Sequence, residues 1–211
     1  MEFDAMARFL QDVGNDDTDD AGFGALGLAW VARRARISVI APAAAREQLS
    51  MSTWCSGTGK RWAERRTSMV GDSGARVEAA TIWIHLDPTS GKPVPWGEEF
   101  ADTYLPTTGG RQVDARLRLP KTPPDGQPPV AWRFRSTDTD GFGHVNNTAY
   151  LAIAEEFLDL DGACEIQIEW RSPCLATDLL DITTIDDTVW IVDRETNDTR
   201  AVIHRAPTMP S

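Results

Sequence analysis

The stretch from Asp138 to Tyr150 reads Asp-Thr-Asp-Gly-Phe-Gly-His-Val-Asn-Asn-Thr-Ala-Tyr and sets the arrangement of the chain around it. It places two carboxylates, two glycines and a histidine directly before an apolar pattern of helical spacing. The apolar residues of that pattern are Tyr150, Ile153, Phe157 and Leu160, at i, i+3, i+7 and i+10. The sequence therefore predicts a strand, a sharp turn and the start of a helix at this point.

Such a junction offers specific chemistry. Asn146 or Asn147 can cap the helix, whose first N–H groups carry the positive end of the helix dipole and can bind an oxyanion. Glycine on either side of Phe142 lets the backbone bend, and Asp140 and His144 can face one substrate as a general base and its partner. This combination suggests acyl hydrolysis, whereas a solvated Asp/Gly turn before a capped helix is the alternative without chemistry.

The composition limits the kinds of partner. A chain of 211 residues with 41% hydrophobic residues and eight Trp can bury a core, so we exclude global disorder. The formal net charge of -11 argues against nucleic acid and anionic membranes as partners, because the long-range field repels both.

Cysteine usage and the N-terminus favour a reducing compartment. The three cysteines are widely spaced and form no CxxC pair, so we expect neither a disulfide framework nor a metal site, and no cofactor. The N-terminus is acidic, and no run approaches the roughly 20 apolar residues that span a membrane. We therefore expect a cytoplasmic protein.

The rest of the chain reads as two similar units. An apolar stripe predicts a helix from Asp4 to about Gly14, an Asp-rich loop follows, and four strand-like segments cover 28–40, 48–55, 61–69 and 77–86. Periodicity fades between 93 and 129, where Pro, Gly and Thr accumulate, so a semi-extended linker is expected, part of it lying against a sheet. The second unit then gives a strand at 130–136, the helix at 147–158, and strands at 164–170, 179–185, 188–192 and 200–205.

The pattern Asp-Thr-Asp-x-x-Gly-His-Val-Asn-Asn-x-x-Tyr resembles the signature of hotdog-fold thioesterases. With its surroundings it resembles the acyl-acyl carrier protein (ACP) thioesterases over nearly the whole chain. The resemblance implies an α+β fold, a tandem hotdog in which each unit wraps an antiparallel sheet around a central helix. We expect a first unit at 1–96, which lacks the opening strand of the second, a linker at 97–129, and a second unit at 130–211 that carries the motif.

The resemblance also implies the site. Asp140, His144 and Cys174 fall on catalytic positions, with Asp140 as general base or nucleophile and His144 orienting substrate or water. Phe142, Gly143, Asn146 and Asn147 would contact the substrate. A turn aspartate, a histidine that ties the turn to the sheet, and an inert buried cysteine are the alternatives.

Two positions depart from the family pattern. Phe142 stands where plant-type enzymes have Asn, and Pro173 stands where an acid can precede the cysteine. An Asn–His–Cys arrangement is thereby broken, and we expect Asp-centred chemistry similar to that of hydroxybenzoyl-CoA-type hotdog enzymes. Asp140 should therefore matter more than Cys174.

The expected substrate is an acyl-ACP, hydrolysed to a fatty acid and the free carrier. A local basic set could bind an acidic carrier despite the overall charge: Arg33, Arg34, Arg36, Lys60, Arg61, Arg65 and Arg66. Acyl-CoA is the alternative substrate, and a non-catalytic module that binds an acyl chain or a protein is the alternative outside enzymes; a hotdog dehydratase fits less well. A tandem chain can act as a monomeric pseudo-dimer, and a homodimer remains open.

Overall fold

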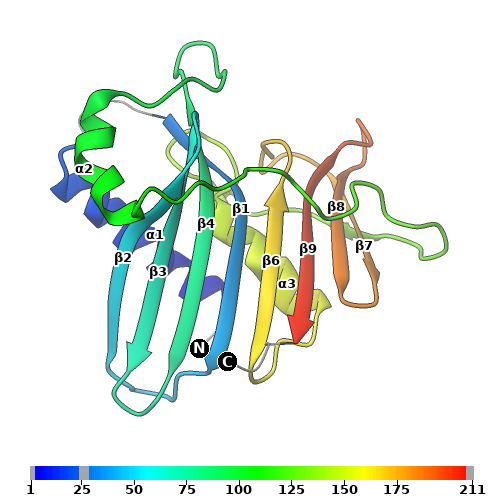
Figure 1. Cartoon of the computed structure of the whole chain (residues 1–211). Helices are drawn as coiled ribbons and strands as arrows, with labels where there is room; N and C mark the ends of the chain where they lie inside the picture. The colour runs from blue at the N-terminus through cyan, green and yellow to red at the C-terminus, as the bar shows by residue number, and fades with distance from the viewer. Residues whose placement is uncertain (1–2, 24–28, 208–211) are drawn as a thin grey trace.

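A computed structural model describes residues 3–23 and 29–207, and one antiparallel sheet of nine strands dominates this part of the chain (Figure 1). The strands stand in the order β2-β3-β4-β1-β6-β9-β8-β7-β5. They are β1 (Ala29–Ala41), β2 (Leu49–Thr58), β3 (Trp62–Gly71), β4 (Arg76–Leu86), β5 (Val130–Trp132), β6 (Cys164–Trp170), β7 (Leu180–Ile185), β8 (Thr188–Asp193) and β9 (Thr199–Pro207). Three α-helices accompany them: α1 (Phe3–Asp20), α2 (Glu98–Thr108) and α3 (Tyr150–Phe157).

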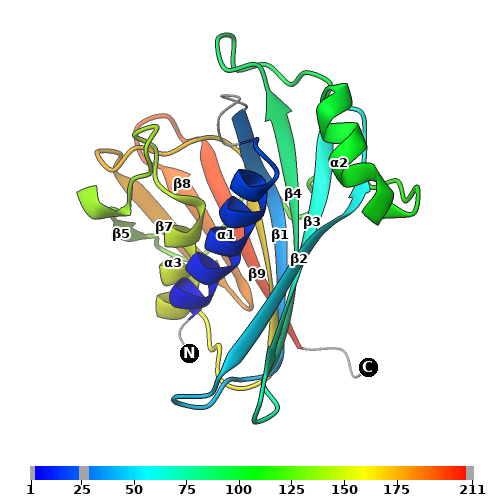
Figure 2. The same cartoon turned by 90° about the vertical axis from the view of Figure 1, so that its left-hand side faces the viewer.

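The two halves of the sheet join where β1 pairs with β6. Ala35 lies opposite Ile168, and Ile37 lies opposite Ile166, in an antiparallel register. Figure 2 shows α1 and α3 on the same face of this continuous sheet, one helix for each half. The expected α+β fold, a tandem hotdog, is therefore confirmed, while the division at 96 and 129 stays a prediction.

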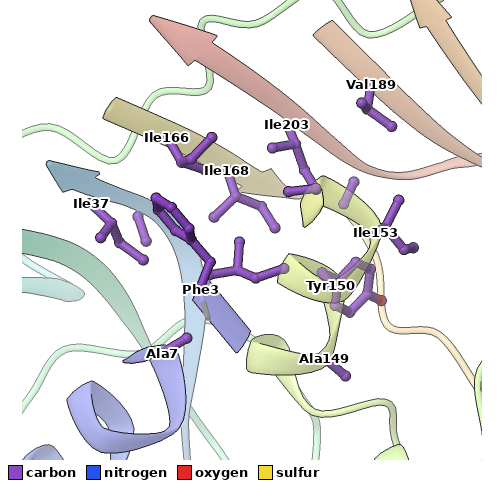
Figure 3. Packing of buried hydrophobic residues seen from close by; sticks show 14 of the residues in the cluster. Phe3, Ala7, Ile37, Ala149, Tyr150, Ile153, Ile166, Ile168, Val189 and Ile203 are labelled. Atoms are coloured by element: carbon purple, nitrogen blue, oxygen red, sulfur yellow. The ribbon is translucent and has the colours of Figure 1, made fainter. Parts of the chain in front are cut away.

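Apolar side chains from both helices and both halves of the sheet form the main core. Ile153 of α3 and Ile166 and Ile203 of the sheet are fully buried. Phe3 of α1 and Tyr150 at the start of α3 pack into the same cluster (Figure 3). Because this cluster draws on both halves, neither half forms the main core alone.

Helix α1 is longer than the sequence predicted, since it runs on to Asp20 through most of the expected Asp-rich loop. Two long-range contacts stabilise this extension. The Asp17 carboxylate accepts hydrogen bonds from Arg65 at 2.7 Å and from the Tyr104 hydroxyl at 3.0 Å. These partners lie 48 and 87 residues away, so local sequence gave no sign of them.

The segment expected to be a semi-extended linker instead forms a helix, α2, in its first part. Phe100 and Tyr104, one helical turn apart, are buried in a second cluster beside β2. Pro106 inside the helix and Thr near its end concealed this periodicity. Helix α2 also lies against the edge strand of this half of the sheet, because the Thr107 hydroxyl donates to the Cys55 carbonyl of β2 at 2.7 Å.

The chain after α2 lies across the face of the sheet opposite to α1 and α3, as Figure 1 shows. Its main anchor is Glu169 of β6, a fully buried carboxylate that accepts hydrogen bonds from the amides of Arg118 at 2.6 Å and Leu119 at 3.1 Å. Arg171 pairs with the same carboxylate at 3.2 Å and donates to the Leu119 carbonyl. A buried charge needs such partners, and here they fix the segment to the sheet.

None of the helices within residues 3–23 and 29–207 is long and apolar enough to cross a bilayer.

The central packing of α3 can be tested at Ile153. We expect Ile153→Ala to lower the free energy of unfolding by about 2–5 kcal/mol, because the lost side chain leaves a cavity in a dense core. Leu179→Ala is the control, since Leu179 is 41% exposed, and it should cost no more than about 0.5 kcal/mol. Urea denaturation of the two variants measures the difference, and equal losses would contradict the packing described.

Candidate active site

The motif begins with an ion pair between exposed Arg135 and the buried Asp138 carboxylate, which shapes the turn. Strand β5 ends at Trp132, earlier than predicted, and a short 3₁₀ helix follows at Ser136–Asp138. The Asp138 carboxylate accepts hydrogen bonds from the backbone and the guanidinium of Arg135, both at 2.8 Å. Burial opposes ionisation of Asp138, but these bonds from Arg135 hold its pKa below the usual range. The first carboxylate of the motif is therefore structural.

Asp140, the second carboxylate, has one oxygen engaged and one available. Its Oδ1 accepts hydrogen bonds from the amides of Phe142 at 2.9 Å and His144 at 3.1 Å, and its own amide donates to the His144 carbonyl at 2.8 Å. Gly143 closes the loop with a φ of 81°, a left-handed conformation that favours glycine. Within the described residues Oδ2 accepts no hydrogen bond, so Asp140 is held in place with an oxygen free to take a proton.

The side chains of Phe142 and His144 face outward. Phe142 is 82% exposed, and the ring of His144 is exposed and makes no hydrogen bond within the described part of the chain. Asp140 and His144 therefore lie at the two ends of one hydrogen-bonded turn, Asp140 half-buried and His144 exposed. Their catalytic role stays a prediction.

Asn146, and not Asn147, caps the helical segment. Its side-chain oxygen accepts hydrogen bonds from the amide and the hydroxyl of Thr148, at 2.9 and 3.0 Å. Asn147 is the first residue of a 3₁₀ turn, Asn147–Ala149, that leads directly into α3. The expected helix start is therefore present beside the loop. The sequence alone could not show which of the two adjacent asparagines caps it.

Cys174 lies next to the motif through its backbone. The Val145 amide donates to the Cys174 carbonyl at 2.8 Å, which ties the loop to the segment between β6 and β7. The thiol itself is buried beside Tyr150. Burial, and after it the nearby Asp178 carboxylate, raises the pKa of Cys174 to about 12. A thiol in this state is protonated at neutral pH and is a weak nucleophile.

Two clefts lie elsewhere in the molecule, beside α2. One, of about 350 Å³, is lined in part by Thr58, Trp96 and Leu105, and another of similar size lies between Trp30 and Phe100. The second cleft contains His85, but that ring is buried and lies within 3.2 Å of two backbone carbonyls. Neither cleft contains Asp140 or His144.

Sequence reasoning missed the structural role of Asp138 and the contacts around Cys174. The i, i+3 spacing of Arg135 and Asp138 could have indicated the structural role of Asp138. The environment of Cys174 is formed by Tyr150 and Asp178, and by Arg200 from β9, which only the fold brings together.

A tandem hotdog with a capped helix and an Asp–His loop at its start is the architecture of a hotdog-fold thioesterase. The chain belongs to the acyl-ACP thioesterase family: the model of the family's N-terminal domain matches residues 1–104, and that of its C-terminal domain matches residues 127–205.

Two relatives are similar to this chain over most of its length. An uncharacterized protein of Mycobacterium tuberculosis is 28% identical over 177 residues, which cover 82% of this chain and 70% of that protein. The chloroplastic oleoyl-acyl carrier protein thioesterase 1 of Arabidopsis thaliana is 23% identical over 213 residues, covering 86% of this chain and 58% of the plant protein.

Solved structures show the same fold. The 12:0-ACP thioesterase from Umbellularia californica superposes with a TM-score of 0.76 at 16% identity, covering 99% of this chain and 91% of the plant chain. An acyl-ACP thioesterase from Bacteroides thetaiotaomicron gives a TM-score of 0.76 at 15% identity, with coverages of 98% and 90%.

A thiol-specific chromogenic reagent at neutral pH can test whether Cys174 is a buried, protonated thiol. Because the pKa of Cys174 is raised and all three cysteines are buried, we expect the native protein to react far more slowly than the unfolded protein. Cys174→Ala should leave the native rate unchanged. A rapid native phase that disappears in Cys174→Ala would show an accessible thiolate and contradict this description.

Proposed function

We propose that this protein hydrolyses the thioester of a fatty acyl-ACP, releasing a fatty acid and the free carrier, with Asp140 as the central catalytic residue. The observation that carries the proposal is the state of Asp140. Two backbone amides fix its Oδ1, Oδ2 remains without a hydrogen bond in the described residues, and exposed His144 follows four residues later. Membership of the acyl-ACP thioesterase family supports the reaction class.

The proposed chemistry follows from these positions. Asp140 either removes a proton from water, which attacks the thioester carbonyl, or attacks that carbonyl itself to give an anhydride that water then hydrolyses. In both routes the C–S bond breaks and the departing thiolate takes a proton, for which His144 is the nearby donor. At the start of the helical segment Asn146 already accepts hydrogen bonds from the Thr148 and Ala149 amides, so the Asn147 amide would be the donor to the oxyanion, a role that is typically worth about 3 kcal/mol.

The departures from the family pattern favour Asp140 over Cys174. Phe142 supplies no side-chain donor, and Pro173 supplies no carboxylate to activate the thiol beside it. The raised pKa of Cys174 adds to this, since it keeps the thiol protonated. We therefore assign Cys174 to the support of the loop through its carbonyl, and Asn147, Gly143 and Phe142 to the surface that the substrate meets.

The basic residues that could bind an acidic carrier are the reason for proposing ACP as the partner. Several of these side chains, however, pair with other groups of the fold. Arg65 binds Asp17, and Arg34 donates to the carbonyl of Arg116 at 2.7 Å. Lys60 and Arg61 are exposed in the turn between β2 and β3 and are the members best placed to meet an acidic carrier. An acyl-CoA would use the same carboxylate and histidine.

A non-catalytic acyl-binding module is the second candidate, because an 82% exposed Phe142 occupies the loop position at which plant-type enzymes have a polar side chain. An exposed aromatic residue suits contact with an apolar ligand or a partner protein. This candidate predicts binding of acyl-ACP without release of thiol.

Thiol release from acyl-ACP and acyl-CoA of several chain lengths tests the proposal. We expect Asp140→Asn to lower kcat/KM by about 10²-fold or more, because the amide cannot accept the proton. Cys174→Ala should retain turnover within a few-fold of wild type. Asp125→Asn, at an exposed site in the segment before β5, is the matched control and should match wild type.

The outcomes separate the candidates. Faster turnover of acyl-ACP than of acyl-CoA supports the proposed carrier, and the reverse preference replaces it with coenzyme A. Equal activity in Asp140→Asn and wild type would overturn the Asp-centred mechanism. Binding without turnover on any thioester would establish the non-catalytic module.

A further inference from the structure

The position of the catalytic loop depends on a segment that has no regular structure. The Val145 amide, directly after His144, donates to the Cys174 carbonyl at 2.8 Å. The His144 carbonyl, which shares that peptide group, accepts the Asp140 amide at 2.8 Å. A displacement of Cys174 would therefore move the peptide that closes the loop between Asp140 and His144.

Arg200, near the start of β9, holds the chain on both sides of Cys174. Its guanidinium donates to the Pro173 carbonyl at 3.0 Å, immediately before the cysteine. It also donates to Asp178 at 3.3 Å, and the same Asp178 oxygen accepts the Leu175 amide at 3.0 Å, immediately after the cysteine. One planar group thus spans the segment that supports the loop.

Asp193 fixes the guanidinium from the other side. Arg200 donates to its carboxylate at 2.7 Å, and the Arg200 and Asp193 side chains are only 16% and 6% exposed. Asp193 is itself held by the amides of Glu195 at 2.9 Å and Thr196 at 2.8 Å. An arginine presents five donors in a rigid plane, whereas a lysine is a single point of charge and cannot bridge these acceptors together.

We propose that Arg200 is a positioning residue of the active site: it holds Pro173 to Asp178 so that the Cys174 carbonyl meets Val145 and sets the distance between Asp140 and His144. This inference rests on the proposed thioesterase function. Arg200 acts through the backbone and does not touch the substrate, so its loss should alter catalysis by misplacing the loop.

Arg171→Lys is the matched control for Arg200→Lys. Arg171 is equally buried, at 15% side-chain exposure, and pairs with a buried carboxylate, Glu169. Its guanidinium contacts the Leu119 carbonyl on the opposite face of the sheet, and not the Cys174 segment. Both substitutions remove a buried arginine contact, so a general loss of stability affects both variants.

Two measurements on the full chain test the inference at a temperature well below both unfolding transitions. The first is amide hydrogen exchange at Val145, which should become at least about tenfold faster in Arg200→Lys and remain near wild type in Arg171→Lys. The second is steady-state hydrolysis of the preferred thioester. Here Arg200→Lys should lose about 10- to 100-fold in kcat with little change in KM, since a small misplacement of catalytic groups has effects of this size.

Unchanged exchange at Val145 in Arg200→Lys would overturn the inference, whatever the activity. Faster exchange with wild-type kcat would overturn the link to catalysis, as would equal losses of kcat in both variants. If wild type hydrolyses no thioester, the proposed function fails together with the catalytic part of the inference. The exchange of Val145 then still decides whether Arg200 holds the loop.

Discussion

The hydrogen-bonded pairing of β1 with β6 is the interaction on which the rest of the structure depends. It converts two hotdog units into one sheet, places α1 and α3 on one face, and merges their apolar side chains into a single core. The buried carboxylate of Glu169, at the end of this seam, also fastens the segment that connects the units. Separation of the strands would expose that core.

The candidate site uses this rigid frame to hold an irregular loop. Asp138 and Asn146 fix the two ends of the loop, one through an ion pair and the other through a helix cap. The Cys174 carbonyl holds the loop at Val145, next to Asn146, and Arg200 connects that support to β9. Most polar groups around the loop hold it in place, and the proposed mechanism therefore uses the free oxygen of Asp140 and the exposed ring of His144.

Much of the fold could be predicted from the sequence, because alternating apolar residues bounded by glycine and proline identify strands reliably. The segment predicted at 164–170 coincides with β6, and the other predicted strands apart from β5 lie within a few residues of those observed. The opening strand of the second unit shortens to β5 because Arg135 and Asp138 bend the chain into a 3₁₀ turn. Helix α2 was missed because Pro106 and its threonines weaken the local signal.

The site was predictable only where it depends on local sequence. The loop brings Asp140 and His144 together through local spacing, so the motif alone indicated the pair. The burial of Cys174 and its contacts with Tyr150, Asp178 and Arg200 depend on the tertiary structure, which no local pattern encodes. The choice between Asp140 and Cys174 therefore needed the departures at Phe142 and Pro173 together with the burial seen in the structure.

Peptide mass spectrometry of the enzyme during a single turnover in oxygen-18 water tests the Asp-centred account most directly. The account predicts that the heavy oxygen appears in the released fatty acid or in the carboxylate of Asp140, and that the peptide containing Cys174 never carries an acyl group. An acyl thioester on Cys174 that forms and decays at the rate of turnover would contradict it.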